Sequence, residues 1–391
     1  MTKDKWIEDI EELALELPKR HKNLFFYKKE EEFYEEIEGL KNNIDNHDSY
    51  EIAVNLGKIV ASFRDAHTSL SLPVRLLYPM ELYWFKDGIY VTHTLEEYKE
   101  MLNCRITRIN NIEIEEIINI LSEIVSYENQ WLLKSQLPKF LPAVEILYGL
   151  EIIDDFGSLE LTCEDKNGIE KTLEISPLSI KEVREKLKLS SIDKINLTLC
   201  EKSSDKYYWF EYLENLKTVY FKYNACRNMD EINVYDFCDK LIKFIEEKNV
   251  EKLIIDFRNN FGGDSRLLDP FIEYVKSSKT INNKGNLFVI VGRETFSSAL
   301  LNVFSLKENT KAIFVGEGSG GKPNCYGEVE RFSLKNSGLT VCYSTKYYKI
   351  IEDDDLPSFI PEIMVELEIK NYIEKRDPCL ERILAWNSCK I

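Results

Sequence analysis

The chain has 391 residues, of which 44% are hydrophobic and 30% are charged, and this balance is typical of a folded globular protein. At roughly 150 residues per domain, its length predicts two to three structural units. The formal charge of −17 disfavours nucleic acid and anionic membrane surfaces as partners, because an acidic surface repels phosphate groups.

The sequence shows no sign of a membrane span or an export signal. No apolar run reaches the roughly 18 residues that a spanning helix needs. The stretch from Met1 to Leu17 is acidic and amphipathic, unlike a signal peptide. The nine cysteines show neither a CxxC pair nor a zinc-finger spacing. We therefore expect free thiols, no metal, no cofactor and a cytoplasmic location.

Residues 1–72 are expected to form an N-terminal helical segment. Apolar residues recur at helical spacing in three stretches, which begin near Trp6, Phe33 and Ile52. The third stretch runs into the polar cluster Asp65-Ala66-His67-Thr68-Ser69. This cluster should therefore lie where the helix ends.

Residues 73–190 are expected to form a mixed, β-rich middle region. Aromatic and β-branched residues flank Lys86-Asp87-Gly88, which predicts a hairpin, and a second hairpin is indicated around Asn167-Gly168. From residue 191 onward, short apolar strands alternate with helices. Strands are expected at 219–221, 253–256, 287–291 and 312–315, and helices at 231–247, 265–276 and 297–307. Such alternation predicts an α/β layer with a mostly parallel sheet, whose strands carry chemistry at their carboxyl ends.

Three of these strand ends carry a distinctive motif. The paired glycines of Asp256 to Asp264 expose backbone N–H groups that suit an oxyanion, although they would also suit a tight turn. Ser297 begins a helix, where a serine can act as a nucleophile or simply cap the helix. Gly316 to Asn324 is rich in glycine and contains a lysine, but Pro323 stands where a phosphate loop needs Ser or Thr.

Together these motifs resemble the carboxyl-terminal processing, or tail-specific, proteases and their tricorn-core relatives. Asp256 to Gly263 matches the family's D-x-R-x-N-x-G-G motif, and Thr295 to Ala299 matches its nucleophile turn. Gly316 to Lys322 matches G-E-x-x-x-G-K, with Lys322 placed 25 residues (322 − 297) after Ser297. Segments 360–363 and 375–378 also resemble family segments. The likeness covers about residues 215–385.

The resemblance implies a serine peptidase that cleaves peptide or protein substrates through an acyl-enzyme. Its implied fold is α/β (α+β overall), with a crotonase/Clp-protease-like mixed sheet in a catalytic domain over residues 191–391 and a weakly PDZ-like middle region. Ser297 would be the nucleophile, and amides at Gly262, Gly263 and Ser298 would hold the oxyanion. A homo-oligomer is compatible with the sequence.

The general base is open between two residues. The processing proteases use a lysine at the position of Lys322, whereas Asp65-Ala66-His67-Thr68 resembles the D-x-H-T segment whose histidine is the base in the tricorn-like branch. His67 could also merely cap or pack at a helix end. Tyr326 stands where the lysine branch has an orienting glutamine, so we favour His67. Candidate supporting carboxylates are Asp65, Glu317 and Asp354.

Two other functions fit the same motifs. One is a non-catalytic peptide- or ligand-binding protein on the same fold, since fold does not fix function. The other is an esterase that uses the same serine.

Overall fold

The computed structural model describes residues 1–190, 197–352 and 356–386 of the chain. Contacts divide the chain into two units. Unit 1 contains residues 1–128, 133–192 and 325–348, and unit 2 contains residues 129–132, 193–324 and 349–391. The N-terminal segment and the middle region therefore share one unit, which also takes in a short piece of the C-terminal region.

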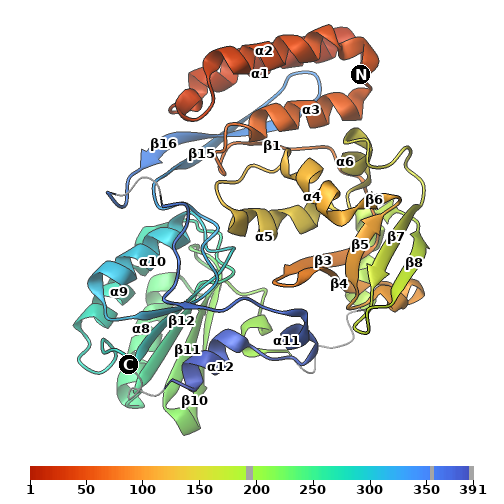
Figure 1. The fold of residues 1–391 in the computed structure, drawn as a ribbon. Helices are drawn as coiled ribbons and strands as arrows, with labels where there is room; N and C mark the ends of the chain where they lie inside the picture. Colours follow the sequence, from red (N-terminus) through yellow and green to blue (C-terminus); the bar gives the residue numbers. More distant parts are fainter. Residues whose placement is uncertain (191–196, 353–355, 387–391) are drawn as a thin grey trace. The chain divides into compact units, whose positions relative to one another are not determined.

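Unit 1 begins with three helices, α1 (Lys3–Arg20), α2 (Glu30–Asn42) and α3 (Ser49–Ala61), separated by the 3-10 turns η1 (Leu24–Phe26) and η2 (Ile44–Asn46). They pack on an antiparallel sheet of order β1-β16-β15 (Figure 1). Its strands are β1 (Ser69–Leu70), β15 (Cys325–Ser333) and β16 (Thr340–Tyr348). Leu334, Val341 and Tyr343 of this hairpin share a core with the apolar stripes of the helices. The three predicted helices are confirmed.

The rest of unit 1 is built on a six-stranded sheet in which β3, β4, β5, β7 and β8 follow one another and β6 pairs with β5. The pairs of adjacent strands are antiparallel, and both predicted hairpins are present as β3–β4 and β7–β8. The strands are β3 (Met80–Phe85), β4 (Gly88–Thr94), β5 (Arg105–Ile109), β6 (Ile112–Glu113), β7 (Leu159–Glu164) and β8 (Glu170–Ile175), beside the short pair β2 (Leu76–Leu77) and β9 (Leu178–Ser179). The accompanying helices are η3 (Glu96–Met101), α4 (Ile114–Ser122), α5 (Gln130–Phe140), α6 (Val144–Gly149) and α7 (Ile180–Ser190).

Unit 2 is an α/β layer around a sheet of order β10-β11-β12-β13-β14-β17, in which only the β10–β11 pair is antiparallel. The strands are β10 (Tyr208–Leu213), β11 (Thr218–Tyr223), β12 (Lys252–Asp256), β13 (Leu287–Val291), β14 (Ile313–Gly316) and β17 (Ile363–Met364). The helices are η4 (Leu199–Glu201), η5 (Glu214–Leu216), α8 (Val234–Glu247), η6 (Ser265–Leu268), α9 (Asp269–Ser277), α10 (Ser298–Asn309), α11 (Ile369–Ile373) and α12 (Pro378–Leu384).

Both faces of this sheet are buried, which explains its continuous apolar strands. Val219 and Phe221 pack with α8, α9 and α10, whereas Tyr220 between them packs with α12 on the other face (Figure 1). The predicted α/β fold with a mostly parallel sheet is confirmed. Because β12, β13 and β14 are parallel neighbours, their carboxyl ends lie at one edge, and the three motif loops begin there.

The chain leaves unit 2 after Asn324 and returns to it at Lys349. Asn324 is buried, and its Oδ1 accepts hydrogen bonds from the backbone N–H groups of Ile350 and Ile351, at 2.7 and 3.0 Å. Its Nδ2 donates to the Ile351 carbonyl at 2.8 Å. One side chain thus ties together the two ends of the segment that unit 1 incorporates.

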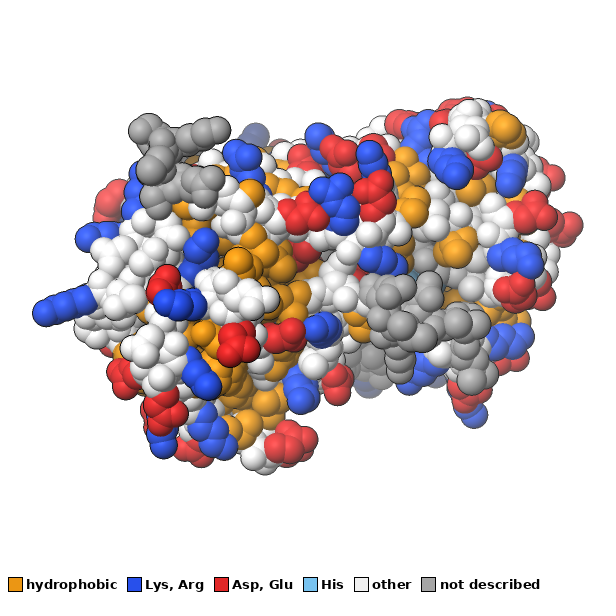
Figure 2. Space-filling view, turned by 90° about the horizontal axis from the view of Figure 1, so that it is seen from below, with side chains coloured by type: hydrophobic (Ala, Val, Ile, Leu, Met, Phe, Trp, Pro, Cys, Tyr) orange, Lys and Arg blue, Asp and Glu red, His pale blue; other side chains and the backbone are white. Residues whose placement is uncertain are grey.

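Acidic and basic side chains alternate over the face shown in Figure 2, with hydrophobic side chains between them. Among the helices that the structure describes, none combines the length and apolar character needed to cross a membrane.

Candidate active site

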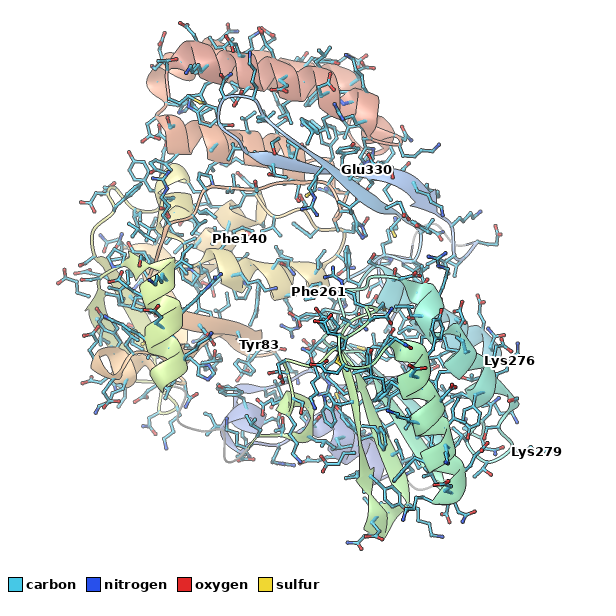
Figure 3. All side chains as sticks on the ribbon, turned by 180° about the vertical axis from the view of Figure 1, so that it is seen from behind. Tyr83, Phe140, Phe261, Lys276, Lys279 and Glu330 are labelled. Atoms are coloured by element: carbon cyan, nitrogen blue, oxygen red, sulfur yellow. The ribbon has the colours of Figure 1, made fainter. Side chains whose placement is uncertain are left out.

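The loop that follows β12 depends on two glycines with left-handed backbones. Gly262 and Gly263 have φ of +103° and +136°. A Cβ on Gly263 would lie 2.1 Å from the Cys226 carbonyl oxygen, and one on Gly262 would lie 2.9 Å from the Ser297 Cβ. The pair therefore allows the loop to lie directly against the serine turn, where no larger residue would fit. Phe261, one residue earlier, is exposed at the carboxyl ends of the unit 2 strands (Figure 3).

Ser297 lies in the turn between β13 and α10. Its backbone has φ 53° and ψ −129°, a conformation that residues other than glycine rarely adopt. Its hydroxyl makes no capping hydrogen bond, although Ser297 occupies the N-cap position of α10. Within the described part of unit 2, Ser297 Oγ has no hydrogen-bond partner. The simple capping alternative is thus not supported, and the strained backbone instead presents the half-buried hydroxyl at the turn.

Neighbouring residues hold this turn through backbone contacts. The Phe296 N–H donates to the Asn260 carbonyl at 3.0 Å, and Thr295 Oγ1 donates to the Phe257 carbonyl at 3.0 Å. Ser298 Oγ donates to the Gly263 carbonyl at 2.6 Å. The serine turn and the glycine loop therefore form one connected piece.

Two backbone amides at this junction are available to a ligand. The N–H groups of Gly263 and Ser298 find no acceptor among the described residues. The Gly262 N–H, by contrast, donates to Asn260 Oδ1 at 2.9 Å. This contact corrects the prediction that Gly262 supplies an oxyanion amide: Gly262 lets the backbone approach closely, and Gly263 and Ser298 remain as the two candidate donors.

Asn260 is fully buried and organises this arrangement. Besides accepting from Gly262, it donates through Nδ2 to the Tyr223 carbonyl at 2.9 Å. Its own carbonyl receives the Phe296 N–H. Asn260 is the asparagine of the glycine motif, but the sequence alone does not indicate these contacts.

A buried network of charged side chains lies at the start of the glycine loop that follows β12. Asp256 lies 3.2 Å from the Lys222 ammonium and 2.8 Å from Arg258 Nε, and Arg258 also contacts Asp377 at 2.9 Å. Burial raises the pKa of Asp256, but the charges of Arg258 and Lys222 outweigh it and lower that pKa to about 2. Two cations and two carboxylates therefore balance one another beneath the glycine loop.

The glycine-rich loop after β14 lies beside the serine turn. The Gly321 N–H donates to the Thr295 carbonyl at 3.2 Å, so Lys322 follows a residue that contacts the turn. Glu317 is buried and holds Arg293 through two hydrogen bonds, of which that from Nε measures 2.7 Å. Asn129 donates to the Gly320 carbonyl at 2.9 Å. Glu317 thus fixes the loop rather than facing a substrate, and the half-buried Lys322 ammonium has no partner in the described part of unit 2.

The Asp65–His67 turn in unit 1 is organised around one carboxylate. Asp65 is 1% exposed, and its Oδ1 accepts the His67 N–H at 3.0 Å. Oδ2 accepts the hydroxyls of Thr68 and Ser344, both at 2.6 Å, and lies 2.9 Å from His21 Nε2. Burial raises the pKa of Asp65, but the hydrogen bonds from His21, Ser344 and Thr68 outweigh it, so the net shift is downward.

His21 has a defined tautomer. Its Nδ1 accepts the Asn23 N–H at 3.0 Å, so its proton lies on Nε2 and is donated to Asp65. The ring also packs against Tyr326, with centroids 5.3 Å apart. Neither His21 nor Ser344 carried a signal in the sequence, because they lie 44 and 279 positions from Asp65.

The His67 ring lies beside the backbone at Tyr326 and Gly327. Burial lowers the pKa of His67, and the nearby charge of Asp65 and the Tyr326 contact offset this only in part. The neutral form of the His67 ring is thus favoured more than in a free histidine. Tyr326, which departs from the lysine-branch pattern, here contributes to the histidine site.

Of the sequence-predicted residues, the structure brings Ser297, Ser298, Gly262 and Gly263 together in unit 2, and Asp65 and His67 together in unit 1. Asp354 lies outside the described residues. Within the described ranges, no group of three or more His, Cys, Asp or Glu side chains is arranged to hold a metal ion.

Comparison of the sequence with protein-family models and with curated proteins finds no match. Solved structures do match. Mature CPAF complexed with lactacystin aligns with a TM-score of 0.67 and 12% identity over 97% of each chain, and a CPAF mutant aligns equally well over 99% of each. The photosystem II D1 C-terminal processing protease aligns at a TM-score of 0.42 and 12% identity, over 93% of this chain and 92% of its own.

The chain has the mixed α/β fold seen in CPAF. This confirms the fold that the sequence motifs implied. At 12% identity, the likeness concerns the fold alone.

Proposed function

We propose that the protein is a serine peptidase with Ser297 as its nucleophile. The observation that supports this most strongly is the strained turn, which presents the Ser297 hydroxyl beside the unpartnered amides of Gly263 and Ser298. A serine used only as a cap would need neither the strain nor the open amides.

In the proposed reaction, Ser297 Oγ attacks the carbonyl carbon of the scissile peptide bond while its proton passes to the general base. The electron pair moves to the carbonyl oxygen, which the Gly263 and Ser298 N–H groups hold. When the C–N bond breaks, the base returns its proton to the leaving amine. Water then attacks the acyl-enzyme ester while the base takes a proton from this water. When the ester C–O bond breaks, the base returns that proton to Ser297 Oγ, and the product acid leaves.

We propose His67 as the base. It is already predominantly neutral at neutral pH because of its lowered pKa, and Asp65 provides a fixed negative charge that stabilises the imidazolium once it forms. Lysine would instead have to lose its proton by desolvation. Lys322 then has the role of positioning substrate.

A fluorophosphonate probe tests the nucleophile, because it reacts with an activated serine and leaves an inert one unlabelled. We expect labelling of the intact chain and its loss in Ser297→Ala, with Ser298→Ala as the matched control that keeps it. CPAF was solved with lactacystin, so protection from the probe by lactacystin is a second measurement. An unlabelled chain would favour the binding-protein alternative, and turnover of esters without peptides would favour an esterase.

We also propose a reducing, cytoplasmic location. Each of the eight described cysteines is free, and Cys389 lies outside the described residues. Titration of denatured, unreduced protein should therefore recover close to all nine thiols. Recovery of only five or fewer would contradict this location.

A further inference from the structure

Unit 1 carries an aromatic surface that the proposed chemistry does not use. Phe26, Tyr27 and Tyr347 are 40%, 55% and 40% exposed, and we call these three residues the aromatic shelf. Phe26 and Tyr347 both pack on the ring of buried Tyr326, with centroids 4.6 and 4.9 Å away. Tyr27 adjoins Phe26 at 6.3 Å. Large aromatic side chains gathered at the surface are typical of binding sites.

The shelf adjoins the His67 turn through two contacts. Tyr326, which supports the rings of Phe26 and Tyr347, is also the residue whose backbone lies beside the His67 ring. At the other end, the guanidinium of Arg64 lies 4.4 Å from the centroid of Tyr27. Arg64 immediately precedes Asp65 in the chain. A ligand on these rings would therefore lie next to the proposed base.

A cation borders the shelf, in contrast to the strongly acidic chain as a whole. The guanidinium of Arg64 lies over Tyr27. Arg64 has no carboxylate partner within residues 1–190, 197–352 and 356–386. An acidic group that approaches the shelf would thus find unneutralised positive charge.

A cavity of about 800 Å³ in unit 1 adjoins the Tyr27 end of the aromatic shelf. Tyr27 and Arg64 are among its lining residues, together with Lys28 and Lys58. Lys28 is already held by Glu36 and by Ser62 at 2.7 Å, and Lys58 lies 2.9 Å from Glu123. Arg64 is therefore the cation of these three that is free to bind a ligand carboxylate, and the cavity has room for a side chain.

We propose that the aromatic shelf and Arg64 form a substrate-binding subsite for peptides, with an apolar side chain on the rings and an acidic side chain beside it at Arg64. That the bound peptide is a substrate rests on the proposed peptidase function, but peptide binding at this subsite does not require Ser297. A second copy of the chain is the competing occupant. It is disfavoured by the net charge of −17, which makes two copies repel each other.

The test measures binding separately from cleavage. Three fluorescein-labelled peptides rich in Ser and Gly differ only in a central triplet, which is Phe-Phe-Glu, Phe-Phe-Lys or Ala-Ala-Glu. Their affinities for the full chain carrying Ser297→Ala are measured by fluorescence anisotropy. We expect the Phe-Phe-Glu peptide to bind at least about tenfold more tightly than the other two, since buried aromatic and arginine contacts commonly have effects of this size.

Variants then assign the binding to the shelf. On the Ser297→Ala background, Tyr27→Ala, Tyr347→Ala and Arg64→Gln should each weaken Phe-Phe-Glu binding by about tenfold. The matched controls are Tyr235→Ala, at a tyrosine that is 45% exposed on α8, and Arg382→Gln, at an exposed arginine on α12. Thermal unfolding checks that every variant is folded, as expected for substitutions of exposed side chains.

Each outcome decides between the two proposals. Equal affinities in shelf variants and controls would overturn the subsite, even if the native chain cleaves peptides. Selective binding without cleavage by the native chain would retain the subsite and overturn the peptidase. A dimer in sedimentation analysis that Tyr347→Ala dissociates would assign the shelf to self-association and overturn the subsite.

Discussion

The serine turn in unit 2 and the Asp65–His67 turn in unit 1 are stabilised by different kinds of interaction. The serine turn depends on backbone geometry: two glycines with positive φ, a strained Ser297 and several main-chain hydrogen bonds. The histidine turn depends on one buried carboxylate that accepts hydrogen bonds from side chains of distant segments. Changes of shape should therefore damage the first turn, whereas changes of charge should damage the second.

The largest expected effect is removal of the proposed base. His67→Gln should lower turnover by roughly 100- to 10,000-fold, the range usual for a lost general base. Lys322→Met should cost clearly less, because we assign that lysine to substrate positioning. Steady-state kinetics on a cleaved peptide provide the measurement. Near-normal turnover in His67→Gln with an inactive Lys322→Met would reverse the assignment.

The second prediction tests the dependence of the serine turn on shape. Gly262→Ala adds a Cβ that would lie 2.9 Å from the Ser297 Cβ and the Ser298 N, and so must displace the Ser298 amide, a proposed oxyanion donor. We expect a loss of about 100- to 1,000-fold in kcat, as for removal of one oxyanion donor. The matched control is Gly39→Ala in α2, where an added Cβ meets no atom within 4 Å. Equal activity of the two variants would refute the close-approach argument.

The third prediction tests the dependence of the histidine turn on charge. Activity should rise with pH as His67 loses its proton, at a midpoint below the ordinary histidine pKa of about 6.5, because burial lowers the pKa of His67. The Asp65 charge raises that pKa, so Asp65→Asn should move the midpoint to still lower pH and reduce kcat/KM by about tenfold. Asp45→Asn, at a side chain that is 89% exposed, should change neither. An upward shift of the midpoint in Asp65→Asn would contradict this assignment.

The smallest effect concerns stability. Ser297→Gly should raise the free energy of unfolding by about 1 kcal/mol, because strain of this kind costs about 1 to 3 kcal/mol and glycine's own entropy offsets part of the relief. Ser297→Ala retains a Cβ and should not show the gain. Chemical denaturation of both inactive variants measures the difference. If both were equally stable, the backbone at Ser297 would not be strained.

These differences also explain how much could be predicted from the sequence. The parallel sheet and the serine turn could be predicted, since apolar strands, paired glycines and fixed motif spacing are all local. The prediction that Gly262 supplies an oxyanion amide was wrong, because the Gly262 N–H donates to Asn260 Oδ1. The spacing of residues in the sequence does not show this contact. The partners of Asp65 could not be found, since His21 and Ser344 become its neighbours only through folding.

The incorporation of residues 325–348 into unit 1 has a consequence for biosynthesis. In the Asp65–His67 turn, His67 lies beside Tyr326 and Asp65 accepts a hydrogen bond from Ser344. Tyr326 and Ser344 both belong to the hairpin that the ribosome makes much later. Ser344 follows His67 by 344 − 67 = 277 positions, which take about 14 to 55 s to translate at roughly 5 to 20 residues per second. During that interval the Asp65–His67 turn of the nascent chain lacks these two residues. The proposed activity should therefore be absent until most of the chain has been synthesised.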